Sequence, residues 1–382
     1  MRRDRVGWLG GVLVDTGKAR WLFDPTVGHL GEGRTVFVTH AHSDHTRGLS
    51  ARSAKYSTRE TYQLYEALTE RRVHRWHPLR VNDSVRFDDV DVTALNAGHI
   101  LGSCQFKVSS PEFTAIYTGD LNCVDTLTTK AAQPEPCDYL IIEATYGHPS
   151  YLFPPRSAVY ADIIRWTMSE IMSGMVPTFQ VYSSGKPQEM VKLFNDYTKI
   201  PVVCSSTISR TNRVYVKNGV KLKYLDTSTS AGARRLKTGG CVHLTTSRHG
   251  QFHPKASRAV TTGWALTQPY RTYASFPLSS HADYDQLLHF IAECHPKKVY
   301  AFTGHAEALI TQVRRRLGID ASTLPQITQT KLFDFYGKPF DDYEEHSAPY
   351  RRRQAHPAAL GRLPKTSARG GQKFDFRGGC KA

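Results

Sequence analysis

The sequence predicts an α/β protein in which one domain is interrupted by a second α/β domain. Up to about residue 147, short apolar runs alternate with turn residues, a pattern typical of strands. From residue 151 to about 278, segments of helical periodicity alternate with short β-branched runs. From residue 279 on, an amphipathic helix, a strand and a further helix resume the first domain.

The first part, expected at residues 1–150, contains six strands and one helix. The strands lie at residues 10–15, 19–25, 35–40, 91–99, 113–120 and 138–144, and the helix lies at residues 58–70.

The insert is expected at residues 151–278. Its helices lie at residues 157–172 and 186–198, and its strands at residues 177–183, 200–206 and 240–247. The first domain then continues over residues 279–340, with helices at 283–295 and 307–318 around a strand at 297–305. Residues 348–382 are rich in proline, glycine, serine and basic residues without apolar periodicity, which predicts a disordered tail.

The charge indicates a polyanionic partner. The 382 residues carry a net charge of +16, and Lys and Arg bind phosphates with release of counterions. Half of this excess lies in the tail, where nine Lys and Arg face one acidic residue. The tail is therefore either a nucleic-acid-binding arm or a solubilising appendage.

Cysteine usage and hydropathy indicate a cytosolic protein, or a nuclear one in a eukaryote. The seven cysteines form no C-x-x-C pair, which argues against a zinc ribbon and a disulfide framework. The sequence contains no run of 18 apolar residues, so we expect no membrane-spanning helix. The opening MRRDRVGWLGGVLVDTGK lacks a small-residue cleavage site, so we interpret it as the first strand pair rather than as a signal peptide.

Residues able to bind a metal or transfer a proton lie at the ends of five of the predicted strands. They are His40, His99, Asp120, Glu143 and His305, while His281 precedes a helix. A sheet can hold several side chains at one point where its strands end together. Nine other histidines are interpreted as ordinary core or surface residues; they are His74, His77, His243, His249, His253, His289, His295, His346 and His356.

The densest group is the segment HAHSDH at residues 40–45. His40 and His42 can turn to one side of an extended backbone, whereas Asp44 and His45 lie past the bend and face another point. One loop could thus serve two adjacent cations, with the two oxygens of Asp120 bridging them. Imidazole with carboxylate favours zinc, with manganese or iron as alternatives. Two such ions would activate water, so the chemistry indicated is hydrolysis.

At these residues the chain resembles the metallo-β-lactamase superfamily, and more narrowly its β-CASP nucleases. The H-x-H-x-D-H motif stands at residues 40–45, and GHILGS, YTGD, EATYG, SSHAD and TGHAE follow in the family's order. The resemblance covers about residues 8 to 335. It implies an αββα sandwich, with the inserted β-CASP domain forming a lid over the metals.

The resemblance also implies roles for the candidate residues. His40, His42, His99 and Asp120 would bind one zinc ion, and Asp44, His45, Asp120 and His305 the other. His281 would act as general acid, oriented by Glu143, and we count Asp44 with these two among the catalytic residues; a purely structural role for Glu143 stays open. In YSSGKPQEM, Gly185 and Lys186 are weaker candidates for phosphate contacts, and Ser183 and Ser184 are weaker still.

The expected partner is single-stranded DNA or RNA. His305 favours RNA, because RNA-processing members have histidine at this motif, although ligase-associated exonucleases keep it too. TTGW at residues 261–264 and the short insert favour the DNA-directed groups, so we expect an exonuclease of the repair type, with RNA processing as the alternative.

Two other functions stay open. One is a metallo-hydrolase of small thioesters or lactams, against which the insert and the basic charge argue. The other is an inactive scaffold, against which the complete ligand set argues. The sequence also leaves open whether the chain forms a homodimer or joins a repair or processing complex.

Overall fold

The computed structural model describes residues 5–17, 19–27, 35–247, 252–268, 270 and 274–327. The basic tail at 348–382, and with it the predicted disorder, lies outside these residues. Within them, no helix is long and apolar enough to cross a membrane, and the six described cysteines form no disulfide.

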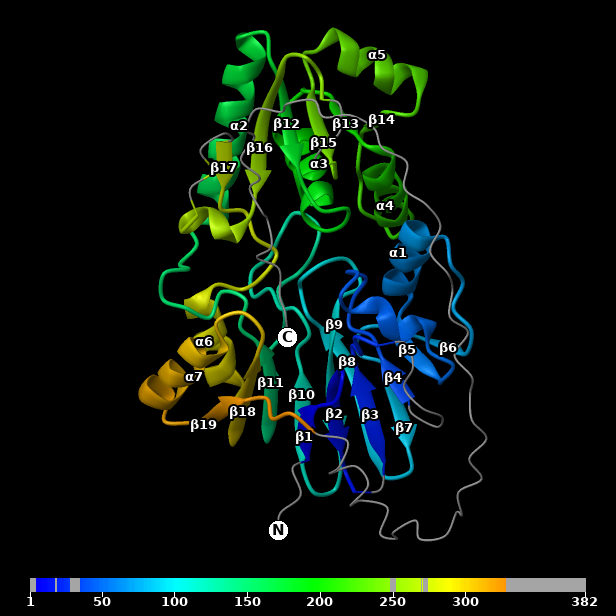
Figure 1. The fold of residues 1–382 in the computed structure, drawn as a ribbon, viewed down its shortest axis with the longest axis vertical. Coiled ribbons are helices and arrows are strands. Elements are labelled where there is room, and N and C mark those ends of the chain that lie inside the picture. Colours follow the sequence, from blue (N-terminus) through cyan, green and yellow to red (C-terminus); the bar gives the residue numbers. More distant parts are fainter. Residues whose placement is uncertain are drawn as a thin grey trace, which may run out of the picture. The chain divides into compact units, whose positions relative to one another are not determined.

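Two sheets form the first domain (Figure 1). The first has the order β1-β2-β3-β4-β5-β6, with strands at Val6–Trp8, Val12–Asp15, Arg20–Phe23, Thr35–Phe37, Lys55–Thr58 and Trp76–Leu79. The second has the order β19-β18-β11-β10-β9-β8-β7, with strands, from β7 upward, at Ser84–Phe87, Val90–Asn96, Cys104–Ser109, Thr114–Tyr117, Tyr139–Glu143, Lys298–Phe302 and Asp320–Thr323.

The apolar faces of these two sheets pack against each other. Trp21, Phe23 and Phe37 from the first sheet share one core with Phe106 and Tyr117 from the second. The outer face of the second sheet is covered by α6 (Tyr284–Cys294) and α7 (Ala306–Gln312), and α1 (Arg59–Thr69) follows β5 of the first. This is the αββα sandwich that the family resemblance implies, so the predicted fold class is confirmed.

The third sheet belongs to the insert and has the order β14-β13-β15-β12-β16-β17. Its strands, in chain order from β12 to β17, are Val176–Gln180, Val202–Cys204, Leu225–Asp226, Val242–Thr245, Ala256–Thr261 and Ala274–Phe276. Every pair in this sheet is parallel. The helices of the insert are α2 (Arg156–Met172), α3 (Lys186–Tyr197), α4 (Ser206–Lys217) and α5 (Ser230–Thr238).

Three shorter helical segments complete the described elements. Two are 3-10 helices, η1 (Thr46–Ser50) after the histidine-rich loop and η2 (Gly263–Leu266) in the TTGW segment. The third, η3 (Val313–Leu317), is a π-helical turn. The helix predicted at 307–318 is therefore α7 followed by this wider turn.

The insert contacts the first domain beside the loop that carries His99. The Leu101 amide donates a hydrogen bond to the Tyr215 hydroxyl of α4, 3.2 Å away. Asn218, just past α4, donates to the Gln63 side chain of α1 at 2.7 Å. Figure 1 shows α1 and α4 side by side at this junction. The domain boundaries predicted from the sequence remain a prediction, since nothing divides the described residues at those positions.

Gly98 is needed where the His99 loop turns. Its φ is +72°, and a Cβ atom there would lie 2.4 Å from the Asn122 carbonyl oxygen and 2.8 Å from the Ala132 amide nitrogen. The neighbouring backbone cannot move easily, because the Asn122 amide donates to the Ala97 carbonyl at 2.9 Å. The loop therefore depends on the missing side chain.

We expect Gly98→Ala to destabilise the protein more than Gly174→Ala. Gly174 has a similar φ of +75° but open space around it, so its replacement should cost only the left-handed backbone strain, about 1–2 kcal/mol. At Gly98 the overpacking adds about 1–3 kcal/mol. Chemical denaturation of both variants measures the difference. Equal losses of unfolding free energy would contradict the close approach.

Candidate metal centre

Four of the candidate ligands follow their strands at one common spacing. His40 lies three residues after β4, His99 after β8, Asp120 after β10 and His305 after β18. Glu143 is the last residue of β11. The register makes β10, β11 and β18 parallel neighbours, and places β8 in the same direction two strands from β10. The polar residues after β8, β10 and β18, and Glu143 at the end of β11, therefore lie at the same end of the second sheet.

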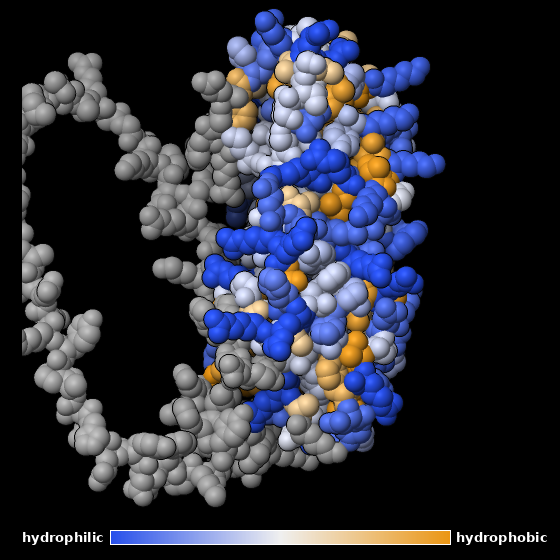
Figure 2. All heavy atoms as spheres, turned by 90° about the vertical axis from the view of Figure 1, so that its right-hand side faces the viewer, coloured by the Kyte–Doolittle hydropathy of each residue, from blue (hydrophilic) through white to orange (hydrophobic). Residues whose placement is uncertain are grey.

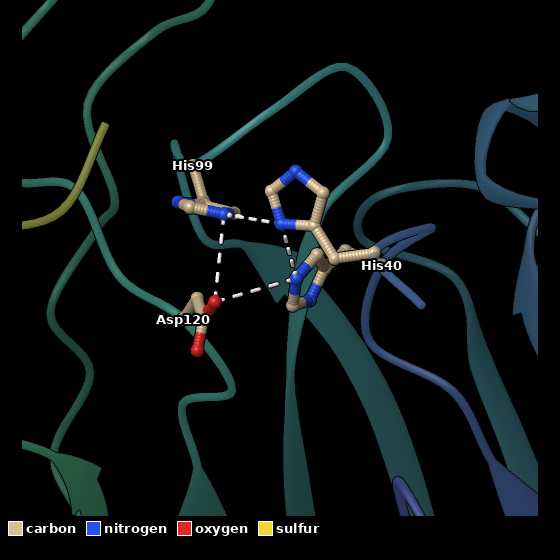
Figure 3. Close-up of side chains that lie close together, drawn as sticks. His40, His99 and Asp120 are labelled. Atoms are coloured by element: carbon tan, nitrogen blue, oxygen red, sulfur yellow. Dashed lines mark hydrogen bonds and ion pairs between the residues drawn. The ribbon is translucent and has the colours of Figure 1, made fainter. Parts of the chain in front are cut away.

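Three histidines and Asp120 converge at this end. His42 Nδ1 lies 3.0 Å from His40 Nε2 and 3.0 Å from His99 Nε2. Asp120 Oδ2 lies 3.4 Å from His40 Nε2 and 3.5 Å from His99 Nε2. Figure 3 shows His40, His99 and Asp120 turned toward one another.

This arrangement fits a divalent cation. Ligand bonds of about 2.0–2.1 Å at a tetrahedral centre place the ligand atoms about 3.3–3.4 Å apart, close to the separations seen here. His42 Nδ1 also faces two ring nitrogens at once, and its single hydrogen or lone pair can satisfy only one of them. A cation among the three nitrogens removes this conflict, so the donor set suits a divalent metal such as zinc.

The far sides of the His99 and His40 rings contact polar groups, whereas Nε2 of His42 is buried without a hydrogen-bond partner among the described residues. His99 Nδ1 donates to the Ser280 carbonyl at 2.8 Å, and His40 Nδ1 contacts the Thr39 hydroxyl at 3.0 Å. Burial, reinforced by His40, lowers the pKa of His42 to about 3, and burial with nearby His281 holds the pKa of His99 well below its ordinary value. The neutral ring of His99, anchored through Nδ1, leaves its Nε2 lone pair facing inward, and the contact at Nδ1 of His40 turns Nε2 of that ring to the same side.

The second predicted ligand set begins on the other oxygen of Asp120. His45 Nε2 lies 3.5 Å from Asp120 Oδ1 and 3.5 Å from Asp44 Oδ2. Burial alone would raise the pKa of Asp120, but the neighbouring His45 and His40 outweigh it and hold that pKa well below the ordinary range. An ionised Asp120 thus faces both groups of ligands with different oxygens.

Asp24 is a residue of this site that the sequence analysis did not identify. It follows β3 directly and is 4% exposed. Its Oδ2 accepts from His45 Nδ1 at 2.8 Å and from the Tyr117 hydroxyl at 3.0 Å, while Oδ1 accepts from the Thr39 amide at 2.8 Å. The rule that polar residues at strand ends form the site applies to Asp24 as well, and would have found it.

Replacing Asp24 by asparagine should weaken metal binding by about 10–100-fold, as is typical when a group that orients a ligand is lost. The asparagine side chain has one oxygen instead of two to accept from the Thr39 and Tyr117 donors. Its NH2 group would face His45 Nδ1, which is itself a donor. The measurement is a metal titration against a chelator. Tyr117→Phe removes only one donor and should have a smaller effect; an Asp24→Asn affinity equal to that of the wild type would exclude this role.

His281 and Glu143 form a pair beside the metal cluster. His281 Nδ1 lies 2.9 Å from Glu143 Oε1, and its Nε2 lies 4.0 Å from Asp120 Oδ2. Glu143 also accepts from the Leu121 amide at 2.6 Å and from the Thr145 hydroxyl. Burial lowers the pKa of His281, but the charges of Glu143 and Asp120 outweigh it, so the net shift of its pKa is upward. Glu143 therefore orients the His281 ring and favours its protonated form.

His305 belongs to none of the groups of closely spaced ligand atoms found among the described residues. Its ring centroid lies 5.2 Å from that of Tyr151 and 5.5 Å from that of His148. Its Nε2 is buried without a hydrogen-bond partner, and burial with nearby His148 lowers the pKa of the ring. A buried, neutral nitrogen of this kind is available to a metal, so the ligand role of His305 stays a prediction.

The two weaker candidates lie at the start of α3. Gly185, with a φ of +89°, precedes the helix, and Lys186 is its first residue. The Gly185 amide donates to the Gln188 side chain at 2.7 Å. Burial lowers the pKa of Lys186 to about 8. The charge of Lys186 in turn acts to lower the pKa of His281. Lys186 is therefore near the site, while contact with a phosphate stays a prediction.

A family comparison agrees with this geometry. Residues 11–182 match the model of the family described as "Beta-lactamase superfamily domain". Residues 11–182 therefore form a metallo-β-lactamase domain. The matched range contains the HAHSDH motif, His99, Asp120 and Glu143, as well as the start of the insert.

Relatives of known description come from several organisms. A protein named "Probable DNA ligase" from Opitutus terrae is 30% identical over 82% of this chain and 30% of its own length. The "RNase J-like protein" of Methanocaldococcus jannaschii is 26% identical over 54% of this chain and 57% of its own. The "5' exonuclease Apollo" of Gallus gallus is 27% identical over 72% of this chain and 59% of its own. The chain thus spans less than two thirds of each of these proteins.

A solved structure confirms the fold. A protein of unknown function from Enterococcus faecalis superposes with a TM-score of 0.61, covering 84% of this chain and 97% of that one. At 14% sequence identity the likeness concerns the fold alone.

Proposed function

We propose that this chain is a metal-dependent nuclease that hydrolyses phosphodiester bonds and shortens DNA strands from an end. The observation that carries the proposal is the joint placement of two groups at one end of the sheet: the cluster of His40, His42, His99 and Asp120, and the His281–Glu143 pair. A metal cluster alone would fit many hydrolases. An oriented proton donor beside it fits a reaction in which an oxygen leaves a phosphate.

The proposed cofactor is a pair of zinc ions. His40, His42, His99 and Asp120 would hold one, and Asp44, His45, Asp120 and His305 the other. When bound, such a pair lowers the pKa of water and neutralises charge on a phosphoryl oxygen.

The chain's own side chains would supply the remaining steps. His281 would hold a proton at Nε2 for the leaving oxygen, because Glu143 accepts at Nδ1 and fixes the ring. Glu143 is held in turn by the Leu121 amide and the Thr145 hydroxyl. Lys186 would face the negative charge of a neighbouring phosphate.

A basic face supports nucleic acid as the substrate. Figure 2 shows the side of the molecule formed by α1, α4 and α5, over which strongly hydrophilic side chains project. Exposed basic residues of these helices, and of the segments that follow α1 and α4, are Arg59, Arg71, Arg72, Arg213, Lys217, Lys221, Lys223, Arg234, Arg235 and Lys237. Such residues bind phosphates without regard to sequence.

The DNA assignment rests on the relatives. The Opitutus protein is named a probable DNA ligase, and its similarity extends over most of this chain. RNA processing is the second candidate function, because the RNase J-like relative matches the chain and the last motif carries His305.

Degradation of matched 5′-labelled and 3′-labelled single strands, in DNA and in RNA, tests the proposal with zinc-loaded full-length protein. Stepwise loss of the label from one end of DNA, with RNA spared, supports it. Cleavage of RNA with DNA spared would move the function to RNA processing. Internal cuts without end trimming would exclude exonuclease action.

A further inference from the structure

Tyr182 is an exposed aromatic residue beside the proposed metal site. Its side chain follows β12 and is 62% exposed. The ring centroid lies 6.5 Å from that of His42, which is part of the metal cluster. Single exposed aromatic residues are common on protein surfaces, so exposure alone would mean little. The position next to His42 is what distinguishes this one.

The backbone around Tyr182 is fixed on both sides. The preceding residue, Val181, is buried, and its amide donates to the Thr245 carbonyl of β15 at 2.9 Å. The following residue, Ser183, accepts at its carbonyl from the Thr211 hydroxyl at 2.7 Å and from the Gln188 side chain at 3.3 Å. A side chain presented from such a rigid segment keeps its position without help from a ligand.

Lys186 completes the surroundings of the ring. Its Nζ lies 5.1 Å from the Tyr182 ring centroid, and the residue is only 8% exposed. Within the described part of the chain, no carboxylate lies within ion-pair distance of its ammonium group, and nearby Glu189 pairs with Arg156 at 2.6 Å. An aromatic face and an ammonium group without a carboxylate partner thus lie together at the edge of the cluster.

We propose that Tyr182 is a stacking platform for the nucleobase next to the scissile phosphate, with Lys186 facing the phosphate of the same nucleotide. The inference rests on the proposed function and adds to it a subsite for one base. Bases of every kind stack on an aromatic ring, so the platform binds single strands without sequence preference. A base paired in a duplex does not present its face, so the subsite selects unpaired ends.

The test compares Tyr182→Ala, Tyr182→Phe and the wild type on two kinds of strand. The first kind carries ordinary nucleotides only. The second kind consists of two strands, each with one abasic residue, on the 5′ side of the scissile bond in one and on the 3′ side in the other. Tyr197→Ala is the matched control, because Tyr197 is 64% exposed and ends the same helix that Lys186 begins.

With the ordinary strand, we expect Tyr182→Ala to lower kcat/KM by about 10–100-fold, while Tyr182→Phe and Tyr197→Ala stay near the wild type. With the abasic residue at the stacking position, the wild type should fall to the level of Tyr182→Ala. An equal loss for Tyr182→Ala on the ordinary and both abasic strands, or no loss at all, would overturn the proposal.

Strand affinity in the presence of a chelator separates this inference from the proposed function. If the wild type cleaves neither polymer, the nuclease proposal fails. A weaker affinity of Tyr182→Ala for the ordinary strand but not for the abasic one would still support the base subsite. Equal affinities of all variants for both strands would remove it.

Discussion

Replacing Asp120 with alanine should abolish metal binding and hydrolysis together. The carboxylate faces His40 and His99 with one oxygen and His45 with the other, so it is the residue that joins the two proposed ligand sets. Its removal should weaken metal binding by more than the factor of about 100 seen for groups that merely orient ligands. Activity should fall by about 10³-fold or more, because a metal supplies several kcal/mol to such reactions.

The Asp120 variant should also show what the carboxylate does for folding. Without it, His40 and His99 lose the carboxylate oxygen that lies 3.4 and 3.5 Å from their Nε2 atoms, which is unfavourable for any protonated ring. Elemental analysis measures the metal, and a cleavage assay measures the activity. Asp125→Ala is the control, because Asp125 pairs with Lys130 at an exposed position five residues away. Full metal content in Asp120→Ala would contradict the proposed ligand role.

His281→Ala should differ from Asp120→Ala in keeping its metal. Its cleavage should still fall by about 10²–10⁴-fold, the range for general acid–base groups. The ring stands beside the cluster, with Nε2 4.0 Å from Asp120 Oδ2, and is bonded through Nδ1 to Glu143. The loss should be in kcat, because the proton is needed in the reaction rather than in binding.

The matched control for His281 is His289→Ala, which changes an exposed histidine on α6 and should leave cleavage unchanged. The cleavage activity of Glu143→Gln should lie between those of the wild type and His281→Ala, since the amide can still contact the ring but carries no charge. Loss of metal from His281→Ala equal to that from Asp120→Ala would show that the two roles have been assigned wrongly.

The convergence of His40, His99 and Asp120 could be predicted from the sequence better than several of the elements around them, while their role as ligands stays a prediction. Buried strands of β-branched and aromatic residues are easy to recognise, and each ligand stands just after one of them. His40, His99 and Asp120 could therefore be predicted to meet. Asp24 stands at the end of a strand as well, but its role as the partner of His45 becomes visible only in the pairing of β3 with β4.

Elements with few apolar residues were not predicted. The helix α4 has the sequence STISRTNRVYVK, in which Ser, Thr and Asn are poor helix formers. It forms because Ile208, Val214 and Tyr215 are buried against neighbouring elements, a tertiary effect that overrides local propensity. Tyr182 was not identified from the sequence either, because its closeness to His42 depends on how the insert packs on the first domain.

The most direct test of the account is cleavage of a single-stranded DNA by full-length protein that has been stripped of metal and then reloaded with zinc, beside His281→Ala treated in the same way. We expect no cleavage by the stripped protein, recovery on addition of zinc, and a loss of about 10²–10⁴-fold in the variant despite full metal content. A zinc-loaded wild type that cleaves neither DNA nor RNA, or a His281→Ala variant as active as the wild type, would contradict it.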